Sequence, residues 1–195
     1  MKLLDCTLRD GGYLNDWKFG HDNIVTIYER LVSAKVDIIE VGFLDERRLY
    51  DFDRSILPDT DSVKQTYGDL DRGQSMIVAM IDYGTCGIDR VQECADCYLD
   101  GIRVIFKKDK MRGAIAFCGE LKEKGYKVFV QPMLTMRYTD DELKRLIYES
   151  NRMEAFAVYF VDSYGYMNEY DINRIYELYD KYLDPKIHIG FHAHN

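Results

Sequence analysis

Short apolar segments alternate with segments of helical periodicity along the whole chain, and this alternation limits the folds available to it. The expected strands are one that begins at Leu3 and the segments 37–43, 76–82, 102–106, 128–133, 156–162 and 187–194. Helical stretches separate them, and Thr139–Glu142 is a capping box that opens one of these helices. Apolar strands that alternate with helices form parallel sheets covered on both faces and joined by right-handed crossovers. The sequence therefore predicts an α/β fold.

The polar residues help to decide between two architectures, a doubly wound open sheet and a (β/α)8 TIM barrel. No glycine-rich phosphate-binding fingerprint follows the first strand, which argues against a nucleotide-binding open sheet. Polar side chains occur instead at or near the C-terminal ends of different strands: Asp10, Glu40, Asp82, Gln131, Asp162, His192 and His194. A closed barrel gathers those ends into one ring, where barrel enzymes have their active sites. We therefore predict a TIM barrel.

The length of the chain falls short of a complete barrel. Its 195 residues suit a single domain, 1–195, whereas a full barrel takes about 250 residues. We expect a barrel truncated after strand 7, lacking strand 8 and the C-terminal region. Either the sequence is a fragment, or another chain closes the gap between strands 7 and 1. An open edge at that gap favours pairing with a second copy, so we expect a homo-oligomer.

Composition and charge argue against several classes of protein. The net charge of −8 and the pI near 5.0 argue against nucleic acid as a partner. No apolar stretch approaches the length of about 18 residues needed to span a membrane, and the N-terminus is too polar for a signal peptide. Five irregularly spaced cysteines suit free thiols in a reducing cytoplasm. Cys94 and Cys97 form a CxxC without a second pair, which fits core or surface thiols better than a zinc knuckle.

The last predicted strand carries two histidines that share one face. His192 and His194 are two residues apart, so both imidazoles point to the same side, while Ile187, Ile189 and Phe191 take the opposite side and should pack outward against helices. Two histidines and one carboxylate make a facial metal-binding set, and Asp10 is the best third ligand if strand 1 lies beside strand 7. The alternative is a pair of polar rim histidines satisfied by neighbouring carboxylates.

The first strand ends in Arg9-Asp10-Gly11-Gly12, a cation, an anion and two glycines. In a regular strand Arg9 and Asp10 would point to opposite faces, so aiming both at one place requires the chain to leave strand geometry there, which the glycines allow. An ordinary ion pair at a turn is the alternative. Two other histidines have simpler interpretations: His188 fits a hydrogen-bonded core position, and His21 fits the cap region of the first helix.

Three motifs together resemble the DRE-TIM metallolyase superfamily, whose members are related to HMG-CoA lyase. They are Thr7-Leu8-Arg9-Asp10-Gly11, Ile39-Glu40-Val41-Gly42 and His192-Ala193-His194-Asn195. The segment Asp162–Asn168, followed by Asp171-Ile172, is most similar to the 4-hydroxy-2-oxovalerate aldolase branch. The resemblance runs from the first strand to the last and is loose between Leu44 and Met133.

The resemblance implies a divalent-metal-dependent carbon–carbon lyase, an aldolase that cleaves a 4-hydroxy-2-keto acid to pyruvate and an aldehyde. Asp10, His192 and His194 would bind Mn2+ or Mg2+, and Arg9 would stabilise the keto oxygen and the enolate formed from it. Ser163 would contact the substrate, and Glu40 would be an acid at the edge of the site. The aldolase family commonly pairs with an aldehyde dehydrogenase. The alternatives are an acyl-CoA-using lyase or synthase of the same superfamily, a metal-dependent hydrolase, or a catalytically inactive metal-binding barrel that works with a partner.

Two stretches depart from the aldolase pattern. The family's catalytic base is a histidine shortly after the RDG motif, and Tyr13 occupies that position here. Because a neutral phenol is a poor base near pH 7, the base is Tyr13, His21 or a residue beyond the chain. The Lys107–Lys110 cluster does not match the aldolases either, and it is either a solvated charge run or a site for an anionic substrate.

Overall fold

The computed structural model describes residues 1–194, so Asn195, the last residue of the His192–Asn195 motif, lies outside the described residues. The chain forms two compact units, the first built from residues 1–103 and 124–126, the second from 104–123 and 127 onward. Along the sheet the strands follow in the order β1-β2-β4-β5-β6-β7-β8, with β3 beside β2. The strand β5 (Gly101–Phe106) contributes its first half to one unit and its second half to the other.

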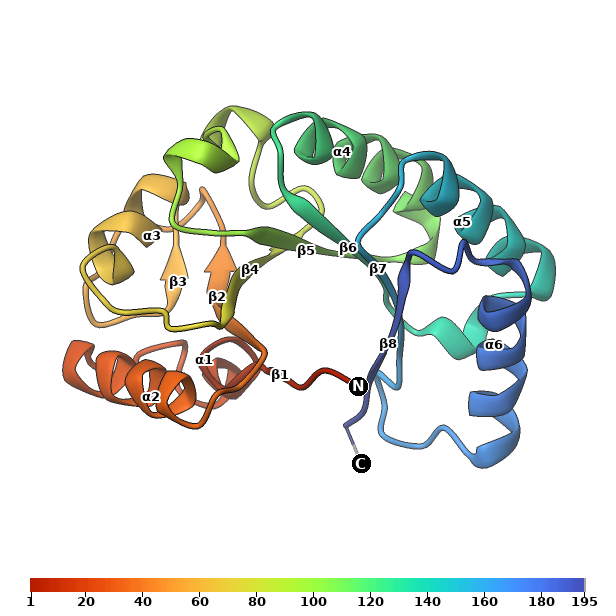
Figure 1. Ribbon diagram of the computed structural model, residues 1–195, viewed down its shortest axis with the longest axis horizontal. Coiled ribbons are helices and arrows are strands. Elements are labelled where there is room, and N and C mark those ends of the chain that lie inside the picture. Colours follow the sequence, from red (N-terminus) through yellow and green to blue (C-terminus); the bar gives the residue numbers. More distant parts are fainter. Residues whose placement is uncertain (195) are drawn as a thin grey trace. The chain divides into compact units, whose positions relative to one another are not determined.

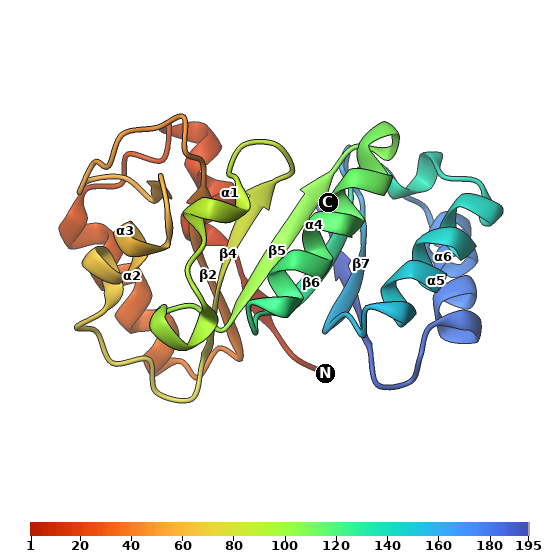
Figure 2. The same cartoon turned by 90° about the horizontal axis from the view of Figure 1, so that it is seen from above.

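The first unit contains parallel strands with helices packed along one side (Figure 1). Its strands are β1 (Leu4–Asp5), β2 (Ile38–Leu44), β3 (Ile56–Leu57) and β4 (Met76–Asp82), and its α-helices are α1 (Thr7–Asp10), α2 (His21–Ser33) and α3 (Thr60–Tyr67). Strand β2 pairs in parallel with both β1 and β4, and Figure 2 shows β2 and β4 side by side. All seven residues of β2 are buried, as expected for a strand covered on both faces.

The second unit repeats the strand-and-helix pattern. Its remaining strands are β6 (Lys127–Pro132), β7 (Ala157–Val161) and β8 (His188–His192), and its helices are α4 (Met111–Glu123), α5 (Asp140–Arg152) and α6 (Glu169–Tyr182). The strand β7 pairs in parallel with β6 and β8. The predicted capping box is present at the start of α5, where Thr139 and Glu142 bond to each other's backbone N–H groups. The α/β class and the parallel pairing predicted from the sequence are confirmed.

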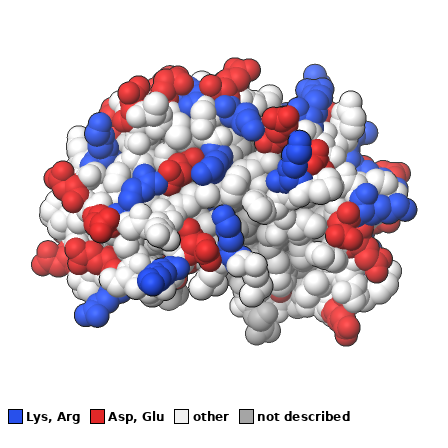
Figure 3. Space-filling model, in the orientation of Figure 1, with Lys and Arg blue, Asp and Glu red and all other residues white. Residues whose placement is uncertain are grey.

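Short 3-10 helices lie between the longer elements, at Gly11–Leu14, Ile88–Arg90, Cys94–Asp96, Lys108–Lys110 and Thr135–Arg137. No helix within residues 1–194 is long and apolar enough to cross a membrane. On the face drawn in Figure 3, acidic and basic side chains are interspersed, and neither sign forms a continuous patch.

The structure corrects several local predictions about the two ends of the chain. Strand β1 is only two residues long, and the chain turns into α1 at Thr7, before the glycines. The last strand ends at His192, so His194 lies beyond it and the alternation of a strand does not fix its direction. Phe191 is 43% exposed and stacks on Phe160 instead of packing under a helix, and His188 is exposed rather than in the core.

Candidate metal and substrate site

In the first unit, Arg9 and Asp10 lie on one helical turn. The backbone N–H groups of both residues donate to the carbonyl of Cys6, at 3.0 and 2.7 Å, so the chain has left strand geometry before it reaches them. The glycines act differently from the prediction: Gly11 has an ordinary right-handed φ of −61°. Gly12 is required for space, because a Cβ there would lie 2.0 Å from the indole ring of Trp17. Trp17 in turn donates from Nε1 to the Arg9 carbonyl at 2.7 Å.

The guanidinium of Arg9 is buried and held by two carboxylates. Its Nε donates to Oε2 of Glu40 at 2.7 Å, and its Nη1 donates to Oδ1 of Asp10. Burial opposes the charge, but Glu40 and Asp10 outweigh it and raise the pKa of Arg9 above its ordinary value. The Nη2 atom is buried and has no hydrogen-bond partner among the described residues. A fixed cation with one unsatisfied donor can bind an oxygen of a ligand.

Glu40 lies deeper than the sequence resemblance implied. Its side chain is fully buried on β2, where Oε2 faces Arg9 and Oε1 forms an ion pair with Nη1 of Arg103 at 2.7 Å. The carboxylate therefore lies between two arginine side chains in the interior and not at an exposed edge of the site. Sequence reasoning missed Arg103. The signal was a charged residue in the middle of the apolar segment 102–106, where its fully buried side chain now lies.

Two candidate bases, Tyr13 and His21, and the thiol of Cys6 belong to the first unit. Tyr13 is 64% exposed, packs edge-on against Trp17, and has a pKa raised chiefly by partial burial. His21 begins α2 as predicted, and its ring stacks on Phe52 at a centroid distance of 3.7 Å. Burial, followed by the charge of Glu40, raises the pKa of the Cys6 thiol to about 11, so Cys6 is not a nucleophile near pH 7.

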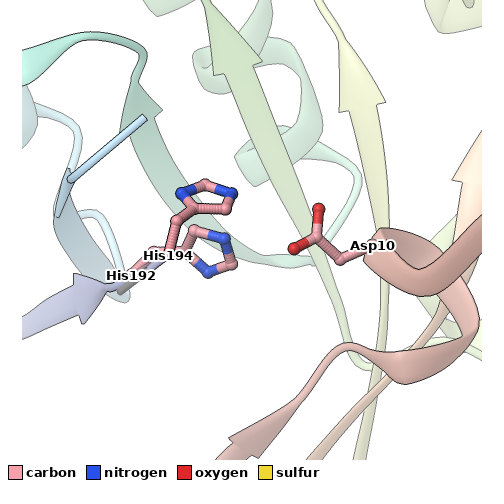
Figure 4. Close-up of side chains that lie close together, drawn as sticks. All are labelled: Asp10, His192 and His194. Carbon is pink, nitrogen blue, oxygen red and sulfur yellow. The ribbon is translucent and has the colours of Figure 1, made fainter. Parts of the chain in front are cut away.

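In the second unit, two histidines occur where β8 ends, while Asp10 is carried by α1 of the first unit (Figure 4). His192 is paired in register with Val161 of β7, and its carbonyl accepts a hydrogen bond from the N–H of Asp162 at 3.0 Å. Nδ1 of His194 lies 2.7 Å from the carbonyl oxygen of Asp162. A carbonyl can only accept, so in the neutral tautomer that makes this hydrogen bond Nδ1 carries the proton and Nε2 offers the lone pair that a metal ion requires. The histidines and Asp10 each offer one potential ligand atom.

The loop after β7 carries Ser163, which directly follows Asp162 in the sequence. The Ser163 hydroxyl accepts a hydrogen bond from the N–H of Leu134 at 2.9 Å, which leaves its own hydrogen able to reach a ligand. The buried Asp162 carboxylate accepts hydrogen bonds from the N–H groups of Tyr166 and Met167, which fixes the course of the loop. The Ser163 hydroxyl is thus held by the N–H of Leu134, and the loop that carries it is held by the Asp162 carboxylate.

Two other motifs have local roles. Lys108 donates to Glu142 at 2.7 Å in a partly exposed ion pair and also to the Arg137 carbonyl, which favours the solvated-charge interpretation of that lysine. The thiols of Cys94 and Cys97 contact the backbone of Leu99, and all five cysteines are free. Among the described residues, no metal-binding group of side chains includes a cysteine.

A profile of the HMGL-like family matches residues 1–195. This chain belongs to that family. The resemblance to the DRE-TIM metallolyase superfamily is therefore confirmed, and with it membership of a family of lyases and aldolases.

Curated relatives and solved structures agree with this assignment. The chain is 27% identical to 4-hydroxy-2-oxovalerate aldolases from Geobacillus genomosp. 3 and Chloroflexus aurantiacus, and each alignment covers all of this chain and 57% or 56% of the relative. The chain thus spans a little over half the length of these relatives. An HMG-CoA lyase from Acinetobacter baumannii, solved with coenzyme A and 3-methylmalate, superposes with a TM-score of 0.77 at 13% identity, covering all of this chain and 67% of that one. These likenesses support the α/β fold of a TIM barrel truncated after its seventh strand.

Proposed function

We propose that this chain carries the metal and substrate site of a divalent-metal-dependent aldolase, which cleaves a 4-hydroxy-2-keto acid to pyruvate and an aldehyde. The observation that carries the proposal is the buried Arg9, which Glu40 and Asp10 hold and whose Nη2 has no hydrogen-bond partner within residues 1–194. Membership of the HMGL-like family and the 4-hydroxy-2-oxovalerate aldolase relatives support it.

The proposed metal ligands are Asp10, His192 and His194. One carboxylate oxygen and two imidazole nitrogens make a facial set for a divalent ion, and each histidine or aspartate here offers such an atom. The choice of Mn2+ or Mg2+ follows from the resemblance to the metallolyase superfamily. The His194 tautomer fits the role, because the carbonyl of Asp162 directs Nε2 to be the ligand. When bound, the ion would supply a Lewis acid that polarises the 2-keto oxygen of the substrate.

The proposed role of Arg9 is to bind the oxygen on which negative charge develops as the carbon–carbon bond breaks. Its position is set before substrate arrives, because Glu40, Asp10 and the indole of Trp17 all contact it. Ser163 would donate its hydroxyl hydrogen to the substrate. A base must also remove the proton of the 4-hydroxyl group, and Tyr13, with its raised pKa, stays protonated near pH 7.

The raised pKa of Tyr13 favours a second candidate function, a metal-binding barrel that does not turn over substrate by itself. In that case a partner, or residues beyond this chain, supplies the base. His21 is the remaining candidate within the chain. The proposal also includes a homo-oligomer, an aldehyde dehydrogenase partner that takes the aldehyde product, and a cytoplasmic location consistent with five free cysteines.

A coupled assay for pyruvate tests the proposal. The protein is loaded with Mn2+ and given a panel of 4-hydroxy-2-keto acids, and pyruvate release is followed with lactate dehydrogenase. We expect release from at least one member of the panel and none from Asp10→Ala. Because the chain spans about half of its relatives, the same assay is run on the full-length parent protein. Bound metal without pyruvate from either protein would favour the second candidate, and no bound metal would overturn both. Light scattering tests the oligomer, which a strictly monomeric mass would contradict.

A further inference from the structure

We propose that Arg103 is a positioning residue for Arg9, acting through Glu40, and that its charge keeps the site attractive to an anionic ligand. The inference rests on the proposed function, since it assigns Arg9 to the substrate. It adds Arg103 to the site, a residue of β5, the fourth strand along the sheet, which lies outside the sequence motifs.

The first part of the argument is geometric. Glu40 has two carboxylate oxygens and each contacts a different arginine: Oε2 bonds to Nε of Arg9 and Oε1 pairs with Nη1 of Arg103, both at 2.7 Å. The side chains of Glu40 and Arg103 are fully buried, and that of Arg9 is 3% exposed. Removal of Arg103 would leave Oε1 of Glu40 without its cationic partner. The carboxylate would then be free to rotate or to bond to Arg9 through both oxygens. Either change would move the guanidinium of Arg9 away from its present direction.

The second part of the argument is a charge balance. Arg9 and Arg103 together carry two positive charges, and Glu40 and Asp10 carry two negative charges, so the cluster is neutral. Without Arg103 the same cluster carries a net negative charge in a buried setting, where charges are poorly screened. Cys6, which also faces this cluster electrostatically, adds no charge near pH 7 because its pKa is raised to about 11. In either the metal-free or the metal-loaded state, the loss of one positive charge weakens the attraction for an anion and strengthens the attraction for a metal cation.

This balance predicts opposite effects on two ligands. In Arg103→Met, the affinity of the Mn2+-loaded protein for oxalate, a planar dianion with the oxygens of an enolate of pyruvate, should fall by about tenfold or more. The affinity for Mn2+ itself should stay the same or increase. Arg103→Lys keeps the charge without the fork of the guanidinium, so it should recover most of the oxalate affinity. Calorimetric titration measures both ligands.

A purely structural role would give a different result. Ile24→Ala, a fully buried change in α2 outside the charged cluster, lowers stability without altering the charge and serves as the control. It should leave both affinities unchanged in the folded protein. Loss of Mn2+ and oxalate affinity to the same extent in Arg103→Met, with no recovery in Arg103→Lys, would overturn the proposal.

A second measurement separates this proposal from the aldolase proposal. In the metal-free protein, the Nε–H of Arg9 should give a slowly exchanging signal in a 15N–1H spectrum, because it donates to a buried carboxylate. We expect that signal to shift and broaden in Arg103→Met and to persist in Arg103→Lys. An unchanged signal in Arg103→Met would overturn the positioning role even if the enzyme is active. A changed signal in a protein that releases no pyruvate would support it although the aldolase proposal fails.

Discussion

The two units hold their candidate site residues by different kinds of interaction. In the first unit, Arg9 and Glu40 are buried side chains fixed by charge, and Arg103 completes the set from β5. In the second unit, His192 and His194 stand at the end of β8 and are fixed by backbone contacts, through pairing with β7 and the carbonyl of Asp162. Buried charges hold a geometry tightly but tolerate almost no change, whereas backbone-held side chains are insensitive to most substitutions around them.

This difference has a consequence for function. A group that must face developing charge gains from being fixed in advance, and Arg9 is the group for which we propose that role. A metal ligand can be oriented by the ion itself, so less protein structure is needed around it. The comparison therefore predicts that stability depends mainly on the charged cluster of the first unit, and that metal affinity depends on each proposed ligand.

The largest effect on stability is expected at Glu40. Glu40→Gln leaves two buried arginines without their shared carboxylate, and the free energy of unfolding should fall by about 3–5 kcal/mol. Asp141→Asn, which removes an exposed ion pair with Lys144 in the second unit, should cost less than about 1 kcal/mol. Urea denaturation measures both, and equal costs would remove the contrast between the two units.

The next effect is on metal affinity, and it should be similar for each proposed ligand. Asp10→Ala and His194→Ala each remove one proposed ligand, and each should weaken Mn2+ binding by at least about 100-fold, since loss of an outer-shell partner alone can cost that much. Elemental analysis and Mn2+ titration provide the measurement. Less than about half an equivalent of metal in the loaded wild type, or unchanged binding in either variant, would contradict the ligand set.

A smaller effect separates one glycine of the first unit from one glycine of the second. A Cβ at Gly12 would lie 2.0 Å from the Trp17 ring, so Gly12→Ala should destabilise the first unit by about 1–3 kcal/mol. Gly119 lies within α4 with open space around its position, so Gly119→Ala should stabilise the second unit by up to about 1 kcal/mol. Thermal unfolding gives both signs. A neutral Gly12→Ala would show that the Trp17 contact does not restrict the turn.

The last effect is a pH dependence at the half-buried thiol of Cys6 in the first unit. The pKa of Cys6 is about 11 in the folded chain and near 9.0 when exposed, so the unfolded state ionises first as pH rises. The contribution of this thiol to stability is therefore complete below pH 9 and should be lost between pH 9 and 11. We expect the difference in unfolding free energy between wild type and Cys6→Ala to decrease over that range. A constant difference would mean that the thiol is not desolvated.

Much of the fold was predictable because its strands are apolar on both faces. The strands around Glu40, Ile77 and Val158 occur where the sequence places them, and the capping box at Thr139 is a local motif that tertiary contacts do not override. The ends were less predictable. The turn into α1 depends on the contact of Trp17 with the Arg9 carbonyl and on that of Ser55, 47 residues further along the chain, with the Leu8 carbonyl. Between β4 and β5, where the alternation of strands and helices predicts a helix, the chain forms the two 3-10 turns Ile88–Arg90 and Cys94–Asp96.

For the candidate site, sequence identified the residue types but not their depth. Arg9 and Asp10 were found from their motif, and the structure shows the bond between them. The burial of Glu40 could not be read from β2, because a strand that is apolar on both sides does not reveal which face lies against a charge. Arg103 was visible as a charge inside an apolar strand, but its partner lies 63 residues earlier in the chain, and only folding brings the two together.

The contact between Trp17 and the Arg9 turn makes the protein its own optical probe. The chain has a single tryptophan, and its indole donates to the Arg9 carbonyl and packs edge-on against Phe43 at 5.5 Å. Its emission therefore reports on the surroundings of the Arg9 turn, whereas circular dichroism reports on the helices and strands of both units. Any variant of the charged cluster can thus be followed without a label, from the emission maximum of one indole.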